Sequence, residues 1–403
     1  MTEHKLRGRL RERLIAALLV GGGLTVALVL GEVMLRAVDF SFPGFHAPDD
    51  IRGSRLRPGA EGWNRREGEV FVKINSQGLR DREHAADKPR HVYRIAVLGD
   101  SYAEALQVEI EEAFWALLPQ QLARCALAQG RQIEAINFGA SGYGTAQQLL
   151  TLRHHAWTYA PDLVLLAFFP GNDVRNNSRA LEPNKLRPFF VLRDDGALEL
   201  DDSFRRSAQF LEHKRRGARF TALRELRLYE LSRKLRATDG GVRHNAPIAV
   251  ALAEGRQDIP SLSEPGLDEH VLRRPPDAAW EEAWTITDKL IVAMHQEVRA
   301  RGARFLLAVL SAPAVVYPDP ALRKRYAEFL RIDEPFYPER RLKQLGERHG
   351  FDVVLLGPDM QRRADATGEF LHGFPNGKLG FGHWNQAGHA LGASLIARHL
   401  CAQ

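Results

Sequence analysis

The sequence predicts a three-layer α/β fold with a parallel sheet, preceded by one transmembrane helix. Two observations support this: strand-like apolar runs alternate with helix-like segments from residue 93 onward, and an uncharged apolar run lies near the N-terminus. With 44% hydrophobic and 26% charged residues among 403, the composition excludes fibrous and wholly disordered chains. Two cysteines exclude a small disulfide-dense scaffold. The net charge of +6 is spread along the chain, so we expect no nucleic-acid partner.

The apolar run, Leu14 to Gly31, is long enough to approach the thickness of a bilayer core. The residues in front of it are mostly basic: Lys5, Arg7, Arg9, Arg11 and Arg13. The positive-inside rule predicts that segment 1–13 is cytoplasmic, 14–35 is an anchor, and the remaining chain lies across the membrane. A cleaved signal peptide and a buried helix are the alternatives.

Residues 36–90 read as a linker with a short β segment, because prolines and glycines cluster between Phe40 and Ala60. Alternation over 70–74 predicts a strand, and Asn75 to Asp81 a turn.

From residue 91 to 403 we expect one domain. Its predicted strands are 93–98, 133–138, 163–169, 304–310 and 351–356. Its predicted helices are 111–130, 145–159, 281–302, 338–350 and 386–400. Strands that alternate with helices in this way form right-handed βαβ units and a parallel sheet.

An insertion at about 174–277 interrupts this alternation. A hairpin around Asp195-Gly196 and an arginine-rich helical stretch are expected in its first half. Residues 238–276 are rich in Gly, Pro and polar residues. We interpret the whole as a lid over the carboxyl edge of the sheet, or as partly disordered.

Four residues follow predicted strands or precede the last helix, where ligands bind in open α/β sheets. Ser101 follows the first strand, Gly139 the second and Asn172 the third, while His383 precedes the final helix. A hydroxyl, a backbone N–H, an amide and an imidazole are what acyl transfer requires.

These four blocks, GDS, NFGASGYG, GND and GHW, resemble the GDSL/SGNH hydrolase family in order and in placement. The resemblance runs from Arg94 to the C-terminus and implies a flavodoxin-like sheet, with Ser101 as nucleophile and His383 as general base. It implies an oxyanion hole formed by the Ser101 N–H, the Gly139 N–H and the Asn172 amide. The segments NSQGLRD, before the first strand, and PDLVLL, before GND, resemble a membrane-anchored bacterial branch of the family. This resemblance implies the inner membrane with a periplasmic catalytic domain.

The sequence departs from the family at the aspartate that normally orients the histidine. Two and three residues before His383 stand Phe381 and Gly380. Three explanations remain open: a carbonyl of the 378–380 turn holds the ring, Asp359 or Glu369 reaches it, or the enzyme is weak or inactive.

In a flavodoxin-like order the first and last helices are neighbours. Cys125 lies late in the first of them and Cys401 just beyond the last, so we predict a disulfide between them, against two separate thiols.

The resulting expectation is a membrane-anchored extracytoplasmic serine esterase acting through an acyl-enzyme. Its expected substrate is an O-acyl, chiefly O-acetyl, group on a cell-envelope glycan. An O-acetyltransferase using the same intermediate and a catalytically silent binding module are the alternatives. We expect no cofactor and no metal.

Overall fold

The computed structural model describes residues 2–123, 125–220, 222–239 and 268–402. The chain forms two compact units. One comprises Met1–Gly44 with Arg216–Val242, and the other comprises Phe45–Arg215 with Arg243–Gln403.

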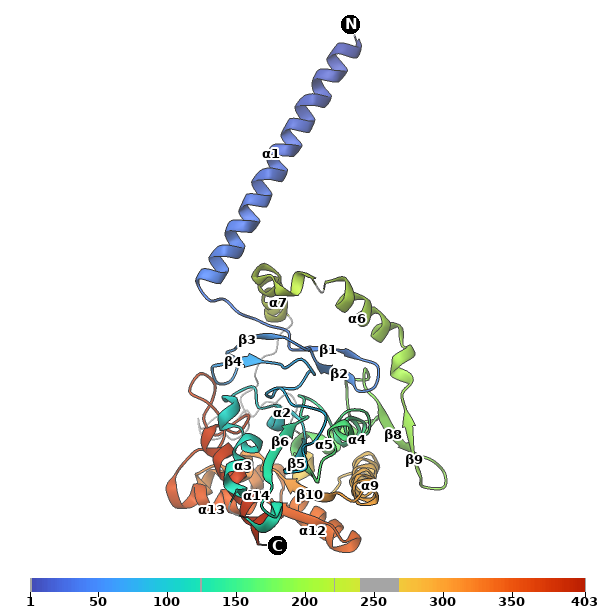
Figure 1. The fold of residues 1–403 in the computed structure, drawn as a ribbon, viewed down its shortest axis with the longest axis vertical. Helices are drawn as coiled ribbons and strands as arrows, with labels where there is room; N and C mark the ends of the chain where they lie inside the picture. The colour runs from blue at the N-terminus through green and yellow to red at the C-terminus, as the bar shows by residue number, and fades with distance from the viewer. Residues whose placement is uncertain (1, 124, 221, 240–267, 403) are drawn as a thin grey trace. The chain divides into compact units, whose positions relative to one another are not determined.

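The smaller unit contains α1 (Thr2–Ala37), η5 (Ala222–Glu225) and α7 (Arg227–Asp239) (Figure 1). Within α1, Arg11–Ala37 contains an 18-residue stretch with a mean hydropathy of 2.4, none of which is buried, so by length and composition this helix can cross a membrane. Glu32 accepts the backbone N–H groups of Arg227 and Leu228, each at 3.0 Å. This carboxylate therefore satisfies donors that the first turn of α7 leaves unpaired.

The larger unit is built on a five-stranded parallel sheet. Its strands are β5 (Val92–Leu98), β6 (Gln132–Asn137), β7 (Leu163–Phe168), β10 (Arg304–Val309) and β11 (Asp352–Leu355). They lie in the order β11-β10-β7-β5-β6, so the expected flavodoxin-like order is confirmed. Every residue of β7, the central strand, is buried, as its unbroken apolar sequence predicts.

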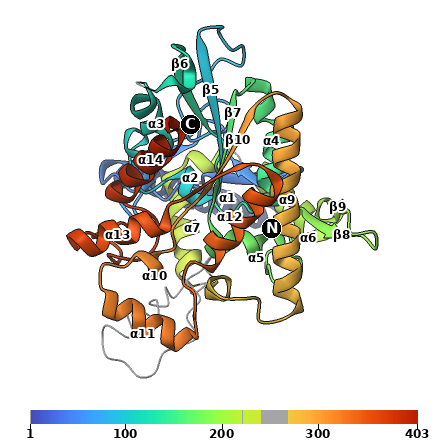
Figure 2. The same cartoon turned by 90° about the horizontal axis from the view of Figure 1, so that it is seen from below.

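Helices cover both faces of this sheet. Figure 2 shows α3 (Phe114–Leu122) and α14 (Gln386–Cys401) on one side and α4 (Thr145–His154) and α9 (Ala278–Ala300) on the other. The helix expected over 111–130 is shorter: α3 ends at Leu122 and is flanked by the 3-10 turns η1 (Ile110–Glu112) and η2 (Ala126–Ala128). The other helical elements are α2 (Ser101–Glu104), η3 (Ala156–Tyr159), α5 (Pro170–Asn177), η6 (Glu269–Leu272), α10 (Pro313–Val316), α11 (Pro320–Leu330), α12 (Tyr337–His349) and α13 (Gly357–Thr367).

A disulfide joins Cys125 to Cys401, as predicted, with the Cα atoms 5.3 Å apart. It ties the chain just beyond α3 to the end of α14, the two helices that pack together on one face of the sheet.

In the segment expected to be a linker with a short β segment, 36–90, the structure has two antiparallel hairpins, and it confirms the strand predicted over 70–74. The hairpins are β1 (His46–Asp49) with β2 (Gly53–Leu56), and β3 (Glu61–Asn64) with β4 (Val70–Lys73). From Phe45 onward the segment belongs to the same compact unit as the sheet. Gly53 and Gly68 have φ of +83° and +71°, so these glycines serve tight turns rather than a flexible tether.

The insertion begins within α5 and contains β8 (Phe189–Leu192), β9 (Leu198–Asp201), η4 (Ser203–Arg206) and α6 (Ala208–Arg219). The hairpin predicted around Asp195-Gly196 is confirmed, with Gly196 at φ +74°. Most of the Gly/Pro-rich stretch 238–276 lies outside the described residues, so the predicted lid stays a prediction.

Candidate active site

Ser101 is the first residue of α2, directly after β5. Asp100 caps the helix by accepting the Tyr102 N–H at 2.9 Å. A Cβ on Gly99 would lie 2.8 Å from Cβ of Ala103, so a glycine is needed where the turn folds back on α2. The Ser101 hydroxyl is thereby presented at the carboxyl edge of the sheet.

His383 meets Ser101 from the opposite end of the sequence. Its Nε2 lies 2.8 Å from Ser101 Oγ, which is hydrogen-bond distance for proton transfer. The loop that holds it is fixed by His372, whose Nδ1–H donates to the Gly382 carbonyl at 2.9 Å. Burial lowers the pKa of His372 to about 4, so this second imidazole is neutral and positions the loop.

Glu67 occupies the place of the missing aspartate. The Nδ1–H of His383 donates to Glu67 Oε2 at 2.6 Å, and the backbone N–H of His383 donates to Oε1, also at 2.6 Å. Since a carboxylate only accepts, this fixes the tautomer in which Nε2, the nitrogen beside Ser101 Oγ, is the acceptor. Burial raises the pKa of Glu67, but the charge of His383 and its hydrogen bonds outweigh that effect and lower it overall.

The turn between β3 and β4 holds Glu67 in position. Asn64 Nδ2 donates to the Glu67 carbonyl at 3.1 Å. Asn376 brackets the next residue, accepting the Gly68 N–H at 3.0 Å and donating to the Gly68 carbonyl at 2.7 Å. The turn is therefore tied to the loop that precedes His383.

Two glycines explain why the carboxylate comes from Glu67. Gly382 has φ +77°, and a Cβ there would fall on the Glu67 carboxylate. Gly380 has φ +85°, and a Cβ there would fall on the Tyr317 ring. An aspartate at the family's usual position is thus excluded by backbone conformation and by sterics.

The carboxylates expected near His383 lie elsewhere. Asp359 pairs with Arg362, and Glu369 pairs with Arg363 at 3.3 Å. Sequence reasoning missed Glu67 because it lies outside the four motif blocks, in the segment interpreted as a linker. A lone glutamate in a short turn carries no recognisable signal.

Two of the expected oxyanion donors reach the site. Among the described residues the Ser101 N–H has no hydrogen-bond partner, as befits the first residue of a helix. Asn172, in α5 after β7, donates one amide hydrogen to Asp100 Oδ2 at 2.9 Å, which leaves the second for a ligand. Ser101, His383 and Asn172 line one cavity of about 510 Å³.

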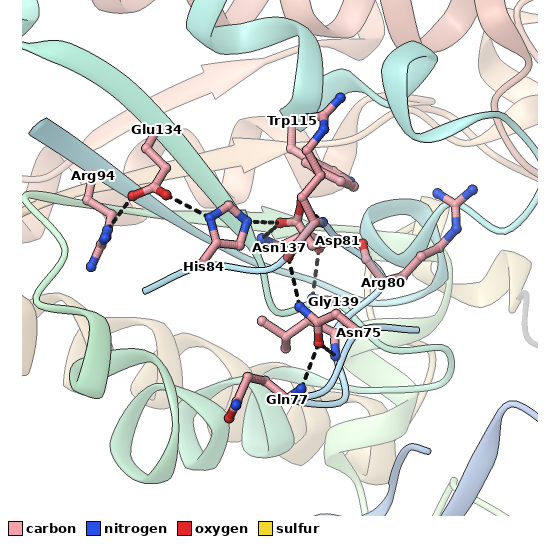
Figure 3. Close-up of polar contacts among 12 residues, drawn as sticks. Asn75, Gln77, Arg80, Asp81, His84, Arg94, Trp115, Glu134, Asn137 and Gly139 are labelled. Atoms are coloured by element: carbon pink, nitrogen blue, oxygen red, sulfur yellow. Dashed lines mark hydrogen bonds and ion pairs between the residues drawn. The ribbon is translucent and has the colours of Figure 1, made fainter. Parts of the chain in front are cut away.

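Gly139 does not reach this cavity. Its N–H donates to Asn137 Oδ1 at 2.9 Å, and Asn137 Nδ2 donates to the carbonyls of Ala103 and Arg80 (Figure 3). Gly142, three residues later, does line it and has φ +75°. Within the part of the chain that the structure describes, the Gly142 N–H is unpaired, so this N–H can donate to a ligand where the Gly139 N–H cannot.

Figure 3 also shows the polar network around Asn137, the residue that accepts the Gly139 N–H. His84 bridges Asp81 and Glu134, and Asp81 accepts the Asn137 N–H at 2.8 Å. Burial lowers the pKa of His84, but the hydrogen bonds to Asp81 and Glu134 dominate and raise it to about 9. This network anchors the residues before β5 beneath the end of β6.

The described ranges hold no cluster of three or more His, Cys, Asp or Glu side chains that could bind a metal ion.

No family model matches the chain. A curated arylesterase from Vibrio mimicus is 30% identical over 105 residues, which are 26% of this chain and 50% of the relative, so the chain spans about half the length of that relative. Among solved structures, an α/β-hydrolase from the metagenome of Lake Arreo, Spain, has a TM-score of 0.37 at 12% identity, covering 77% of this chain and 96% of that one. A catalytic mutant of an acetylxylan esterase from Geobacillus stearothermophilus has a TM-score of 0.36 at 10% identity, covering 76% and 94%. The strand order, the motif positions and the arylesterase match together confirm the expected resemblance to GDSL/SGNH hydrolases.

Proposed function

We propose that this protein is a serine ester hydrolase of the SGNH type that acts through an acyl-enzyme. The observation that carries the proposal is the hydrogen-bonded series Ser101–His383–Glu67, with 2.8 Å and 2.6 Å between the interacting atoms. Nucleophile, base and orienting carboxylate in this arrangement are the parts of a catalytic triad, whatever their order in the sequence.

In the first step Ser101 Oγ attacks the ester carbonyl carbon while its proton passes to His383 Nε2. The oxyanion that forms is stabilised by the N–H groups of Ser101 and Gly142 and by the Asn172 amide. Collapse of the intermediate breaks the bond to the alcohol, which leaves with the proton from His383. Water then attacks the acyl-Ser101 ester while its proton passes to His383 Nε2. Collapse of this second intermediate releases the acid, and His383 returns the proton to Ser101 Oγ.

The setting proposed for this chemistry is the periplasmic side of a bacterial inner membrane, with α1 as the anchor and an O-acetylated cell-envelope glycan as the substrate. The uncovered apolar surface of α1 and the basic residues before it support the anchor. The Cys125–Cys401 disulfide supports an oxidising compartment. The complete triad favours a catalyst over the silent binding module.

The test uses the full chain in detergent with a fluorophosphonate probe and p-nitrophenyl acetate. Labelling and turnover in wild type, both lost in Ser101→Ala and His383→Ala, are expected. A well-folded wild type that neither labels nor hydrolyses the ester contradicts the proposal. Adding an acetylated donor with a glycan acceptor and analysing the products separates hydrolysis from acetyl transfer.

A further inference from the structure

The cavity beside Ser101 contains two arginines that the proposed chemistry does not use. Arg175 lies in α5, one turn after Asn172, so both side chains project from the same face of that helix. Arg187 precedes β8, and both arginines line the cavity that contains Ser101 and His383. Arg187 is 5% exposed and Arg175 is 17% exposed.

These two guanidinium groups share one carboxylate. Arg175 Nε and Arg187 Nη1 each lie 3.8 Å from Glu182 Oε2, beyond hydrogen-bond distance. The other oxygen of Glu182 accepts the Asn184 N–H at 2.8 Å. Two cations, Arg187 buried and Arg175 partly buried, therefore face one anion, which leaves a net positive charge at this end of the cavity.

Two guanidinium donors of the pair have no partner among the described residues. Arg187 Nη2 donates to the Gly142 carbonyl at 2.8 Å and to the Gln147 side chain. In the described part of the chain, Nε of Arg187 and Nε of Arg175 are buried without any hydrogen bond. A buried donor left unpaired costs roughly 1–3 kcal/mol, more when it is charged. The two unpaired donors therefore lower the stability of the folded protein unless a ligand accepts hydrogen bonds from them.

The neighbouring charges do not neutralise the pair. Arg52 pairs with Asp49 at 3.1 Å, and His46 pairs with Glu104 at 3.2 Å, so each of these two residues that line the cavity has its own carboxylate. Burial raises the pKa of Asp173 well above its ordinary value, so its charged form is disfavoured. Desolvation lowers the pKa of Arg187 to about 10, which leaves it cationic at neutral pH.

We propose that the substrate of this site is an ester that also bears a carboxylate or phosphate group, and that Arg175 and Arg187 bind this anion while Ser101 attacks the ester. The inference rests on the proposed function and names its substrate class. Guanidinium groups match such oxyanions with paired, charge-assisted hydrogen bonds. Because Arg187 donates to the Gly142 carbonyl, the bound anion is also linked to the residue whose N–H is the proposed oxyanion donor.

The test compares two esters that differ in one charge: 3-acetoxybenzoate and its methyl ester. The kcat/KM for each is divided by its rate of hydroxide hydrolysis, which removes the difference in intrinsic reactivity. Wild type is expected to favour the anionic ester at least ~10-fold, the effect of about 1.4 kcal/mol of differential binding. Arg175→Gln is expected to bring the ratio close to one.

Glu182→Gln is expected to change the preference between the two esters in the opposite direction from Arg175→Gln. It removes the competing carboxylate while its amide oxygen can still accept the Asn184 N–H, so the preference for the anionic ester is expected to rise. Arg153→Gln is the matched control, because Arg153 pairs with Glu297 at 2.8 Å and does not line the cavity. Thermal unfolding of each variant verifies that the fold is retained.

The inference is overturned if wild type hydrolyses the two esters at equal normalised rates and neither variant changes their ratio. In that case hydrolysis of the methyl ester still supports the proposed function. If neither ester is turned over, calorimetry with benzoate and phenyl phosphate on Ser101→Ala decides. Binding that Arg175→Gln weakens ~10-fold or more supports the anion site, and the tighter of the two ligands identifies the group. Absence of binding for both overturns it.

Discussion

Replacing Glu67 by glutamine tests the central feature of the site. Glutamine is nearly isosteric and its amide oxygen can still accept the His383 backbone N–H, which now bonds Glu67 Oε1 at 2.6 Å. The variant therefore removes the negative charge and leaves the loop supported. Glu67 touches His383 rather than substrate, so it is a positioning residue, and its loss should affect kcat more than KM.

The expected magnitude follows from the electrostatics of the pair. Two unit charges about 4 Å apart attract by about 4 kcal/mol at an effective dielectric constant of 20. In a Ser-His-Asp triad with a buried carboxylate the corresponding change lowers kcat by about 10⁴. Here the side chains of His383 and Glu67 are 26% and 22% exposed, so solvent weakens the interaction. We expect kcat to fall ~10²- to 10³-fold, or about 2.7–4 kcal/mol.

The assay is p-nitrophenyl acetate hydrolysis by the full chain, with thermal unfolding and proton NMR of the imidazole on the same samples. In wild type the Nδ1–H bonded to Glu67 is expected to give a strongly downfield resonance, which Glu67→Gln should shift or abolish without a large change in unfolding temperature. Asp359→Asn and Glu369→Gln are the matched controls. Both carboxylates pair with arginines away from His383, so these variants should keep wild-type kcat.

The reasoning is refuted if Glu67→Gln keeps kcat within about threefold of wild type, or if either control variant loses as much activity as Glu67→Gln. A loss of activity accompanied by a collapse in unfolding temperature would show that Glu67 is structural rather than positioning.

Three further outcomes are expected. Asn172→Ala should lower kcat for a neutral ester ~10²- to 10³-fold, the usual effect of losing one oxyanion donor, and a loss below tenfold would count against that role. Replacing both cysteines by serine should lower the free energy of unfolding by ~2–4 kcal/mol, because the Cys125–Cys401 bridge closes a loop with a sequence separation of 276 residues; reductant should reproduce the drop in wild type and not in the double variant. The pKa of His84 is raised to about 9 in the folded protein, so its protonated form stabilises the fold. This contribution to the free energy of unfolding is fully present below its ordinary pKa of ~6.5 and is lost as the pH rises toward 9. Denaturant unfolding should therefore show a decline of ~2 kcal/mol over that window, after discounting for solvent screening, that His84→Gln abolishes.

The sheet could be predicted from the sequence because its strands carry strong local signals. Leu163–Phe168 is apolar without interruption, and the glycine and polar residues after each strand mark the carboxyl edge. Ser101 and His383 could be located for the same reason, since each stands next to a regular element whose end is readable. The Cys125–Cys401 pairing follows from topology even though α3 ends before Cys125, short of the helix predicted over 111–130.

What could not be predicted depends on contacts between distant segments. Gly139 looks like an oxyanion donor because it follows β6, but Asn137 takes its N–H, and no pattern in the sequence distinguishes it from Gly142. The strand over 70–74 has an alternating pattern, but the rest of the two hairpins over 46–73 could not be predicted, because turn glycines and linker glycines look alike when the hydrogen-bonded partner is unknown.

The position of Glu67 accounts both for the absence of the family's aspartate before His383 and for the structural role of the β3–β4 turn. At Gly380 the Tyr317 ring and a positive φ exclude an aspartate, and at Gly382 the absent Cβ leaves the space that the Glu67 carboxylate fills. The β3–β4 turn is held there by Asn376, which belongs to the same loop as both glycines. Each feature is local to one end of the sequence, yet the hydrogen bond to His383 requires all of them together. A departure from a family motif is thus weak evidence of inactivity when the backbone at the altered position has made room for a substitute from elsewhere in the chain.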